Sequence, residues 1–182
     1  EAQTELRDGV SLLRAIAAEA TRPGGAVLPS VHPEVLALAI QTPLGVTAVI
    51  THWTFPLAGS IWALASALAA GNTVVFKPAE DTPLVGMRLV EILQEAGLPP
   101  GTISLVHGYG EEAGAPLVRH PDVVLVSFTG SSDVGREVAI TCAAEQKRLA
   151  LDLGQRCVVL VLEDADLDLA VEGVVWGGFA MA

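Results

Sequence analysis

The sequence predicts an α/β protein with a Rossmann-like, doubly wound parallel sheet of about five strands, followed by the start of a second domain. Two observations predict this class. Strand-like and helix-like segments alternate through residues 43–154. The strand-like segments are continuous apolar runs, which is typical of parallel strands that helices cover on both faces.

The N-terminal segment, Glu1–Ala20, is expected to form a helix because its apolar residues recur at helical spacing. Pro23 and the glycines that follow it end this helix. Ala26–Thr42 is then expected to be extended, with prolines at turns or on an edge strand. We therefore expect a helical part in residues 1–25 and an extended segment in residues 26–42.

The next part, residues 43–154, contains five apolar runs that we expect to be strands, separated by helices. Gly71 and Gly97 close the first two of these helices, and Gly97 can take the left-handed conformation of a helix end. We expect strands at Gly45–Ile50, Thr73–Phe76, Ile103–His107, Val123–Phe128 and Leu149–Leu153. We expect helices at Pro56–Ala70, Pro83–Ala96, Gly114–His120 and Ser132–Gln146.

Residues 155–182 are expected to begin a second domain that is incomplete in this chain. They contain a strand-like run at Val158–Leu162 and then a helix opened by Asp166 and Asp168. Aspartates cap helix N-termini and favour the helix dipole, so this acidic cluster indicates a helix start rather than a metal site. No EF-hand spacing is present, and we expect no metal in this chain.

Composition and charge argue against several classes of partner. Of the 182 residues, 51% are hydrophobic, and the net charge is −11 with no run rich in lysine and arginine. This balance argues against nucleic acid or an anionic membrane as a partner. No apolar stretch reaches the roughly 18 to 20 residues of a membrane span, and the charged first residues do not resemble a signal peptide. Two cysteines, Cys142 and Cys157, make no disulfide framework, so we expect buried thiols in a reducing cytoplasm.

Two glycine loops compete as sites for a dinucleotide phosphate, because ligands of open α/β sheets bind at the carboxyl ends of the strands. The first, between Gly108 and Gly114, resembles GxGxxG with one residue too many, and a plain glycine turn into a helix explains it better. The second follows the fourth expected strand and contains Gly130, Ser131 and Gly135. Its serine either binds phosphate oxygens or caps the next helix, whose N-terminus also attracts anions. The residues alone leave both interpretations of this second loop open.

Lys77 and Glu80 follow the second expected strand, the position that meets the adenosine ribose in a doubly wound fold. A carboxylate there accepts hydrogen bonds from both ribose hydroxyls and repels a 2′-phosphate. If the site is used, it should therefore prefer NAD to NADP. The alternative for these two residues is an ordinary solvated ion pair.

In this order and spacing, seven segments together resemble the aldehyde dehydrogenase superfamily over nearly the whole chain. Members of that family oxidise aldehydes to acids or thioesters with NAD(P), and they are usually more than twice this length. The matching segments are PLGVTAVI (Pro43–Ile50), WTFP (Trp53–Pro56), ALAAGNTVVFKPAEDTPL (Ala67–Leu84), EAGLPPG (Glu95–Gly101), HPDVVLVSFTGSSDVGR (His120–Arg136), LDLG (Leu151–Gly154) and DADLDLAV (Asp164–Val171).

The resemblance implies roles on the cofactor side. The pyrophosphate of NAD would lie near Trp53 and Ser131, and the ribose of its adenosine would be held after the second strand. The loop at Gly108 would be only a turn. The residues assigned to the cofactor by this resemblance are Trp53, Lys77, Glu80, Gly130, Ser131 and Gly135.

The resemblance also implies how the rest of the chain is used. Residues 26–42 would contribute to an oligomerisation hairpin, so we expect a homo-oligomer. Residues 43–154 would be the dinucleotide-binding domain. The part from about Gln155 onward would begin the catalytic domain.

The residues that would serve the chemistry depart from the family pattern. The family has asparagine where this chain has Thr54, glutamate where it has Asp152, and proline where it has His52. Thr54 is shorter than the amide that stabilises an oxyanion, and Asp152 reaches one methylene less than the general base. Gln155 and Arg156 also differ, and the segment with the cysteine nucleophile is missing. We therefore expect a truncated or degenerate member whose catalytic end is marked by Thr54, Asp152 and His52.

Three functions remain open from the sequence. We expect the NAD-binding portion of an aldehyde-dehydrogenase-like oxidoreductase, whose reaction converts an aldehyde and NAD to a carboxylic acid and NADH and is not catalysed by this chain alone. One alternative is a natural truncated paralogue repurposed for non-redox acid–base catalysis in the old active-site cleft. The other is a non-catalytic interaction protein. For an enzyme, the expected partner is a small-molecule substrate, and the family indicates an aldehyde.

Overall fold

The computed structural model describes residues 2–22, 24–154 and 158–179. These residues form two compact units, one of residues 2–153 and one from Gly154 onward. The first unit contains the sheet, and the second contains helix α6 (Leu167–Phe179). Gln155, Arg156 and Cys157, which the sequence singles out, lie outside the described residues.

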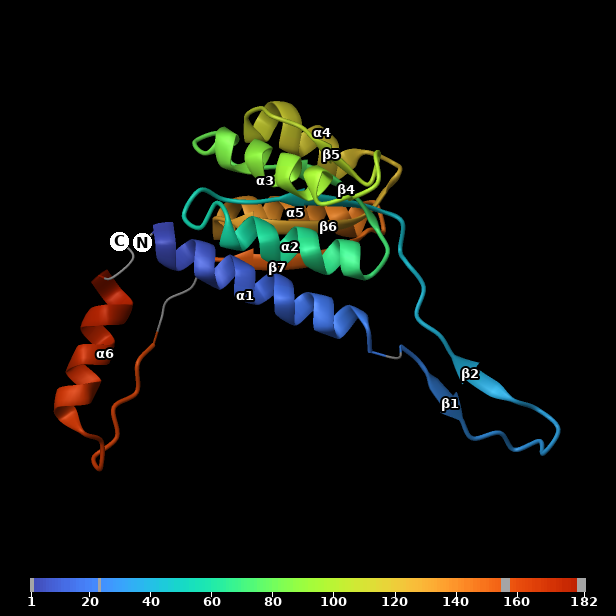
Figure 1. Ribbon diagram of the computed structural model, residues 1–182, viewed down its shortest axis with the longest axis horizontal. Helices are drawn as coiled ribbons and strands as arrows, with labels where there is room; N and C mark the ends of the chain where they lie inside the picture. Colours follow the sequence, from blue (N-terminus) through green and yellow to red (C-terminus); the bar gives the residue numbers. More distant parts are fainter. Residues whose placement is uncertain (1, 23, 155–157, 180–182) are drawn as a thin grey trace. The chain divides into compact units, whose positions relative to one another are not determined.

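The sheet of the first unit has five strands, all of which pair in parallel (Figure 1). Their order across the sheet is β5-β4-β3-β6-β7, so the chain winds outward from β3 in one direction and then returns to wind outward in the other. This confirms the doubly wound α/β class that the sequence predicts. The strands are β3 (Val46–Ile50), β4 (Thr73–Lys77), β5 (Ile103–Leu105), β6 (Val123–Gly130) and β7 (Arg148–Leu153).

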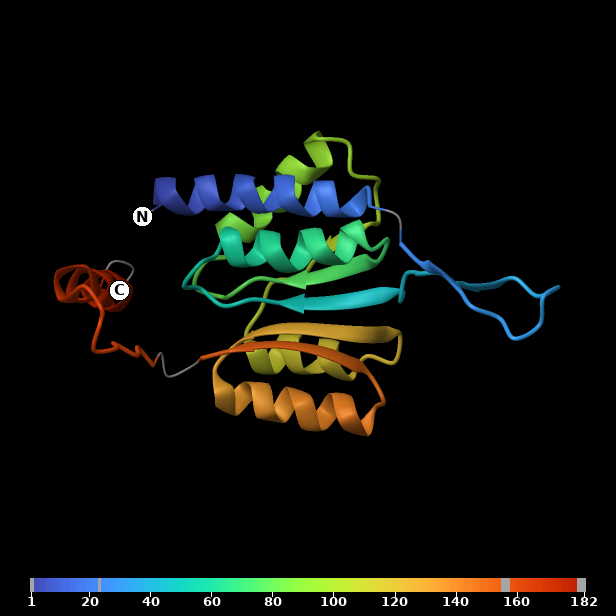
Figure 2. The same ribbon diagram turned by 90° about the horizontal axis from the view of Figure 1, so that it is seen from below.

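Helices cover both faces of this sheet (Figure 2). On one face, apolar side chains of β3, β4 and β5 pack against three helices, α1 (Ala2–Ala20), α2 (Ala58–Ala69) and α3 (Pro83–Glu95). On the other face, side chains of β3 and β6 pack against α4 (Ala115–Arg119) and α5 (Ser132–Ala144). A short π-helical turn, η1 (Gly110–Gly114), runs directly into α4.

Strand β3 shows why the strands of this sheet read as continuous apolar runs. Its side chains point alternately to the two faces, so Val49 joins one core while Ala48 and Ile50 join the other. All three are buried, because each face is covered by helices.

Asn72 closes the turn that leads from α2 into β4. Gly71 takes a left-handed conformation, with φ +79°, and ends the helix there. The buried Asn72 side chain then accepts hydrogen bonds at Oδ1 from the backbone N–H groups of Leu44 (2.7 Å) and Gly45 (3.0 Å). Its Nδ2 donates to the Ala67 carbonyl at 3.1 Å. One buried amide therefore joins the end of α2 to the start of β3.

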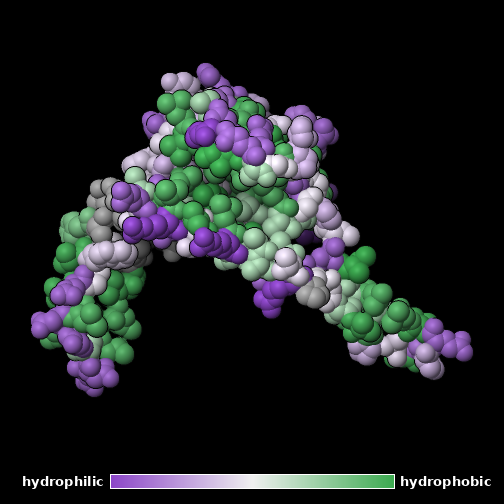
Figure 3. All heavy atoms as spheres, in the orientation of Figure 1, coloured by the Kyte–Doolittle hydropathy of each residue, from purple (hydrophilic) through white to green (hydrophobic). Residues whose placement is uncertain are grey.

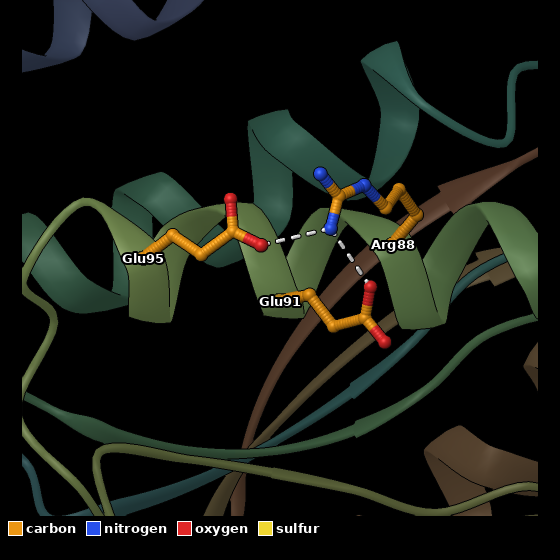
Figure 4. Close-up of polar contacts among 3 residues, drawn as sticks. All are labelled: Arg88, Glu91 and Glu95. Atoms are coloured by element: carbon orange, nitrogen blue, oxygen red, sulfur yellow. Dashed lines mark hydrogen bonds and ion pairs between the residues drawn. The ribbon is translucent and has the colours of Figure 1, made fainter.

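On its exposed side, α3 carries an arginine that binds two glutamates further along the helix (Figure 4). Arg88 Nη1 donates to Glu91 Oε2 and to Glu95 Oε1, each at 2.9 Å. These bonds, the one to Glu91 foremost, raise the pKa of Arg88. Because all three groups are exposed, the network contributes little to stability.

The segment expected to be extended forms a two-stranded antiparallel hairpin, β1 (Ala26–Leu28) and β2 (Ala37–Ala39). Val27 lies opposite Leu38 in its register. Both side chains are exposed, at 72% and 56%.

The expected strand at Val158–Leu162 is wrong. Within the described ranges, no strand pairs with these residues, and their apolar side chains are exposed. An apolar run becomes a strand only when a neighbouring strand accepts its backbone hydrogen bonds. The expected helix after it is present, because Asp166 Oδ1 accepts hydrogen bonds from the backbone N–H groups of Asp168 and Leu169, each at 3.1 Å. No helix in the described part of the chain combines the length and apolar character needed to cross a membrane.

Candidate functional site

The strand order of the sheet changes direction between the neighbouring strands β3 and β6. Open α/β sheets bind ligands at this point, in the crevice outside the carboxyl ends of the strands. Two segments leave the sheet there: the loop of residues 51–57 after β3, and Ser131 after β6.

Lys77 ends β4 and is buried, with only 2% of its side chain exposed. Its Nζ donates to Glu80 Oε2 at 3.0 Å and to the Pro78 carbonyl at 3.1 Å. The Glu80 side chain is 43% exposed, so one end of the pair faces solvent. The alternative of an ordinary solvated pair is therefore wrong for Lys77. A backbone hydrogen bond first, and the bond from Lys77 second, lower the pKa of Glu80 below its ordinary 4.5.

Ser131 is the N-cap of α5, and its Oγ accepts a long hydrogen bond of 3.4 Å from the Val134 N–H. Of the two interpretations left open by the sequence, the structure shows the cap. The serine is exposed at the carboxyl end of β6. Because the bond is long, a stronger acceptor could displace it.

Gly130 and Gly135 are explained by close packing. A Cβ on Gly130 would lie 2.6 Å from Cζ of the Phe128 ring. A Cβ on Gly135 would overlap the side chain of Leu153, which ends β7. The absence of a side chain at Gly130 leaves room for the Phe128 ring. At Gly135 it lets α5 pack closely against β7.

The loop after β3 carries His52, Trp53 and Thr54. His52 is half-buried, and its Nδ1 accepts a hydrogen bond from the Thr54 N–H at 2.9 Å. Trp53 is 60% exposed, and Thr54 is exposed as well. The loop therefore exposes the adjacent side chains of Trp53 and Thr54, and the His52 imidazole stabilises its backbone through the bond from the Thr54 N–H.

Asp152 lies near the carboxyl end of β7, in register with Thr129 of β6. It is exposed and belongs to the same edge of the sheet as the loop after β3, from which it is two strands away. The structure therefore places Asp152, His52 and Thr54 along one edge.

A groove of about 720 Å³ opens on the face covered by α4 and α5. Apolar side chains from β3, β6 and both helices line it, and four carboxylates and one guanidinium lie around them. The apolar residues include Ile50, Val118, Phe128, Val134 and Val138. The charged residues are Glu80, Glu111, Glu112, Arg119 and Glu137. Such a lining suits a flat, apolar and uncharged group, with hydroxyls directed to the carboxylates.

Lys147 joins the two helices that form the walls of this groove. It follows the end of α5, and its Nζ donates to the carbonyls of Val118 and His120, each at 2.6 Å. Both carbonyls lie at the C-terminal end of α4, where cations stabilise the unpaired acceptors of a helix.

A second cavity, of about 300 Å³, lies on the opposite face between α1, α2 and α3. Leucine, isoleucine and alanine side chains line it throughout. Because it offers no polar side chain, it does not suit a nucleotide. Across the described stretches, no three His, Cys, Asp or Glu side chains group closely enough to hold a metal ion.

Cys142 is buried in the core on the α5 face, as expected from the sequence. Burial raises the pKa of its thiol, and the charge of Lys147 lowers it to a lesser extent. This environment is that of an inert structural thiol rather than a nucleophile.

Sequence reasoning missed three parts of this region: the groove, Lys147, and Glu5 of α1. Glu5 Oε1 accepts hydrogen bonds from the N–H groups of Leu57 and Ala58, at 2.8 and 3.0 Å, at the start of α2. Its only sequence signal is a glutamate at helical spacing among apolar residues, which is also typical of a solvated helix face. Most of the apolar groove residues, among them Ile50, Val118 and Phe128, belong to the core of this face and carry no separate signal.

Comparisons with known proteins agree with this geometry. The model of the aldehyde dehydrogenase family matches residues 1–182. A 2,5-dioxopentanoate dehydrogenase of Saccharolobus solfataricus is 43% identical over 179 residues, which are 97% of this chain and 37% of that protein. A phenylacetaldehyde dehydrogenase of Pseudomonas fluorescens is 51% identical over 133 residues, which are 73% of this chain and 26% of that protein.

Solved structures give the same result. An aldehyde dehydrogenase from Brucella melitensis biovar abortus 2308 superposes with a TM-score of 0.94 at 39% identity, over 98% of this chain and 37% of that one. PnpE, crystallised in complex with nicotinamide adenine dinucleotide, superposes with a TM-score of 0.90 at 39% identity, over 96% of this chain and 36% of that one. The chain thus spans little more than a third of the length of these two proteins.

Proposed function

Because this chain belongs to the aldehyde dehydrogenase family, we propose that its residues 43–154 bind NAD at the crevice between β3 and β6. The chain then supplies the cofactor-binding portion of an oxidoreductase that converts an aldehyde to a carboxylic acid. NAD supplies the hydride acceptor for this chemistry. Residues 155–182 begin the catalytic domain, and the reaction is not completed by this chain alone.

The groove between α4 and α5 is the observation that supports this proposal most strongly. Val118 on one helix and Val138 on the other are apolar walls for an adenine ring. Glu80 also lines the groove, where its exposed carboxylate can accept hydrogen bonds from the adenosine ribose hydroxyls. The buried Lys77 ammonium group holds that carboxylate in place through a hydrogen bond of 3.0 Å.

Helix N-termini support a position for the pyrophosphate at α5. The N-terminus of α2 is already occupied by the Glu5 carboxylate. At the N-terminus of α5, the Val134 N–H donates a long hydrogen bond of 3.4 Å to Ser131 Oγ. A phosphate oxygen is a stronger acceptor than a serine hydroxyl, so it can take over these N–H groups. Gly130 ends β6, directly before Ser131, and Trp53 lies on the loop that follows β3.

We further propose that NAD is preferred to NADP. Four glutamates and one arginine line the groove, so a 2′-phosphate would bring two negative charges into an acidic surface. Glu80 is the carboxylate held in place for the ribose, and it would repel that phosphate directly.

Titration calorimetry with NAD and NADP tests both proposals. The chain should show saturable binding of NAD and bind NADP at least about tenfold more weakly, since a tenfold difference is about 1.4 kcal/mol. Glu80→Gln should narrow this difference, because it removes the repelling charge. Glu145→Gln, which removes an exposed carboxylate at the far end of α5, should leave it unchanged. Absence of saturable binding up to about millimolar NAD would reject the proposal.

At the catalytic end, Thr54, His52 and Asp152 are proposed to face the substrate. The hydrogen bond to His52 Nδ1 leaves Nε2 as the protonated nitrogen of the neutral ring. This imidazole is therefore suited to donate to an oxyanion, as the family's asparagine amide does, rather than to accept a proton. Asp152 keeps the carboxylate of the general base at the same edge of the sheet.

We also propose that the chain forms a homo-oligomer through the β1–β2 hairpin. Several large apolar side chains of this hairpin are exposed, among them Val27, Val31, Leu36 and Ile40. A contiguous apolar surface of this kind marks a protein interface, and copies of one chain usually assemble symmetrically.

A further inference from the structure

The Glu5 carboxylate reaches from α1 to the first turn of α2, 52 residues further along the chain. Its Oε1 accepts hydrogen bonds from Leu57 N (2.8 Å) and Ala58 N (3.0 Å), and both bonds are partly buried. These are among the N–H groups that a helix leaves without internal partners. Leu57 is the N-cap residue and makes no side-chain cap of its own. A side chain of another helix therefore caps α2.

The position of Glu5 is fixed by the packing of α1 on α2. Gly9, one helical turn after Glu5, is buried, and a Cβ there would lie 2.7 Å from Cδ1 of Ile61. Ile61 in turn lies one turn after Leu57. Contacts at two successive turns set the register of the two helices, so the carboxylate cannot shift along α2 without disturbing the packing.

The loop that carries Trp53 and Thr54 ends at the residues that Glu5 holds. At its start, the Thr51 N–H donates to the Lys77 carbonyl at 3.2 Å, and Thr51 Oγ1 lies 3.3 Å from Ser60 Oγ. Ser60 Oγ also donates to the Pro56 carbonyl at 2.6 Å. These bonds close the loop onto α2, and Glu5 anchors α2 itself from outside.

We infer that Glu5 is a positioning residue for the loop of residues 51–57. It sets where Trp53 and Thr54 meet the pyrophosphate and nicotinamide side of the dinucleotide. Its negative charge also fills the positive end of α2, so a ligand phosphate is directed to α5 instead. This inference rests on the proposed function, because it concerns the same cofactor.

Binding of AMP and of NAD distinguishes an effect on the groove from an effect on the loop of residues 51–57. AMP reports on the groove, Lys77 and Glu80, whereas NAD also reaches the loop. In Glu5→Gln, titration calorimetry should show NAD affinity reduced about tenfold, the size expected when a hydrogen bond to a charged group is weakened. AMP affinity should stay within about twofold. Asp8→Asn, which removes a charge from an exposed position on α1, should change neither affinity.

Thermal unfolding followed by circular dichroism shows whether each variant is folded. If Glu5→Gln does not fold, Glu5→Asp keeps the charge but shortens its reach, and the same separation of NAD from AMP is expected. An unchanged NAD affinity, or a parallel loss of AMP and NAD, would overturn the inference. An unmodified chain that binds neither ligand would overturn the proposed function and this inference with it. A chain that binds both ligands, with no difference between them in the variant, would overturn the inference alone.

Discussion

At the scale of single residues, the buried ammonium group of Lys77 holds the exposed carboxylate of Glu80 in one position. Lys77 Nζ donates to two acceptors within 3.1 Å, and 43% of the Glu80 side chain is exposed to solvent. The lowered pKa of Glu80 means that the ion pair is present above the ordinary carboxyl value of 4.5. The stability it gives is lost only as the pH falls through the lowered pKa. Because Glu80 is exposed, solvent screening keeps that contribution small.

His52 provides a test of the catalytic end at this scale. Its Nδ1 accepts from the Thr54 N–H, so the neutral imidazole should be the Nε2–H tautomer. Long-range ¹H–¹⁵N NMR spectra, recorded well above the usual titration range of histidine and assigned with His52→Gln, should show a protonated Nε2 and an unprotonated Nδ1. A signal from a protonated Nδ1 would contradict the bond and the donor role built on it.

The sequence predicts some of these residues better than others. Lys77, Glu80 and Ser131 follow strands directly, so the fold alone brings them to the carboxyl edge. Glu5 and Lys147 act on groups 52 and 27 or more residues away. Their contacts depend on how helices pack, which no local pattern encodes. For the same reason, the cap made by Ser131 could be named in advance, but the cap made by Glu5 could not.

At the scale of elements, alternation and apolar runs are enough to predict the five strands and the helices between them. The differences arise where tertiary contacts decide. Strand β6 extends to Gly130 because β7 pairs with it up to Leu153. Residues Val158–Leu162 have the composition of a strand but no pairing partner among the described residues. Composition therefore predicts that a strand can form, and pairing decides whether it does.

Gly86 tests how α3 meets the turn after β4. A Cβ there would lie 2.7 Å from Cβ and 2.8 Å from Cγ of Pro78, whose ring cannot move aside. Gly86→Ala gains about 1 kcal/mol of helix propensity but adds an overpacking cost of about 1–3 kcal/mol. We expect a net loss of about 1 kcal/mol in the free energy of unfolding, measured by urea denaturation.

Gly59→Ala is the matched control for this substitution. Its nearest neighbour would be Cβ of Phe55 at 3.9 Å, so the alanine should be neutral or slightly stabilising. A Gly86→Ala variant as stable as Gly59→Ala would show that α3 can move away from Pro78 freely.

At the scale of the whole molecule, two segments outside the sheet expose many of their large apolar side chains. Figure 3 shows this hydrophobic surface over the β1–β2 hairpin and over α6. In the hairpin, Val31 is 93% exposed, and in α6 Trp176 is 70% exposed. Exposure of this extent is unusual in a monomer, so these segments are the ones that we expect other chains or other parts of a protein to cover.

Light scattering after size-exclusion chromatography tests the proposed homo-oligomer. The mass should be a multiple of 18.8 kDa for the unmodified chain. Leu36→Glu, which places a charge at a 72% exposed position of the hairpin, should reduce it to a single copy. Leu84→Glu, at a 70% exposed position of α3, should leave the mass unchanged. A stable single copy of the unmodified chain would contradict the assembly.

The hydrogen bonds of Lys147 affect which substitutions the groove between α4 and α5 can tolerate. One ammonium group, outside the groove lining, ties the last turn of one wall to the end of the other. The spacing of the walls is therefore set separately from the side chains between them. Substitutions of lining residues by others of similar volume should therefore change which ligand the groove binds. They should leave the separation of α4 and α5 unchanged.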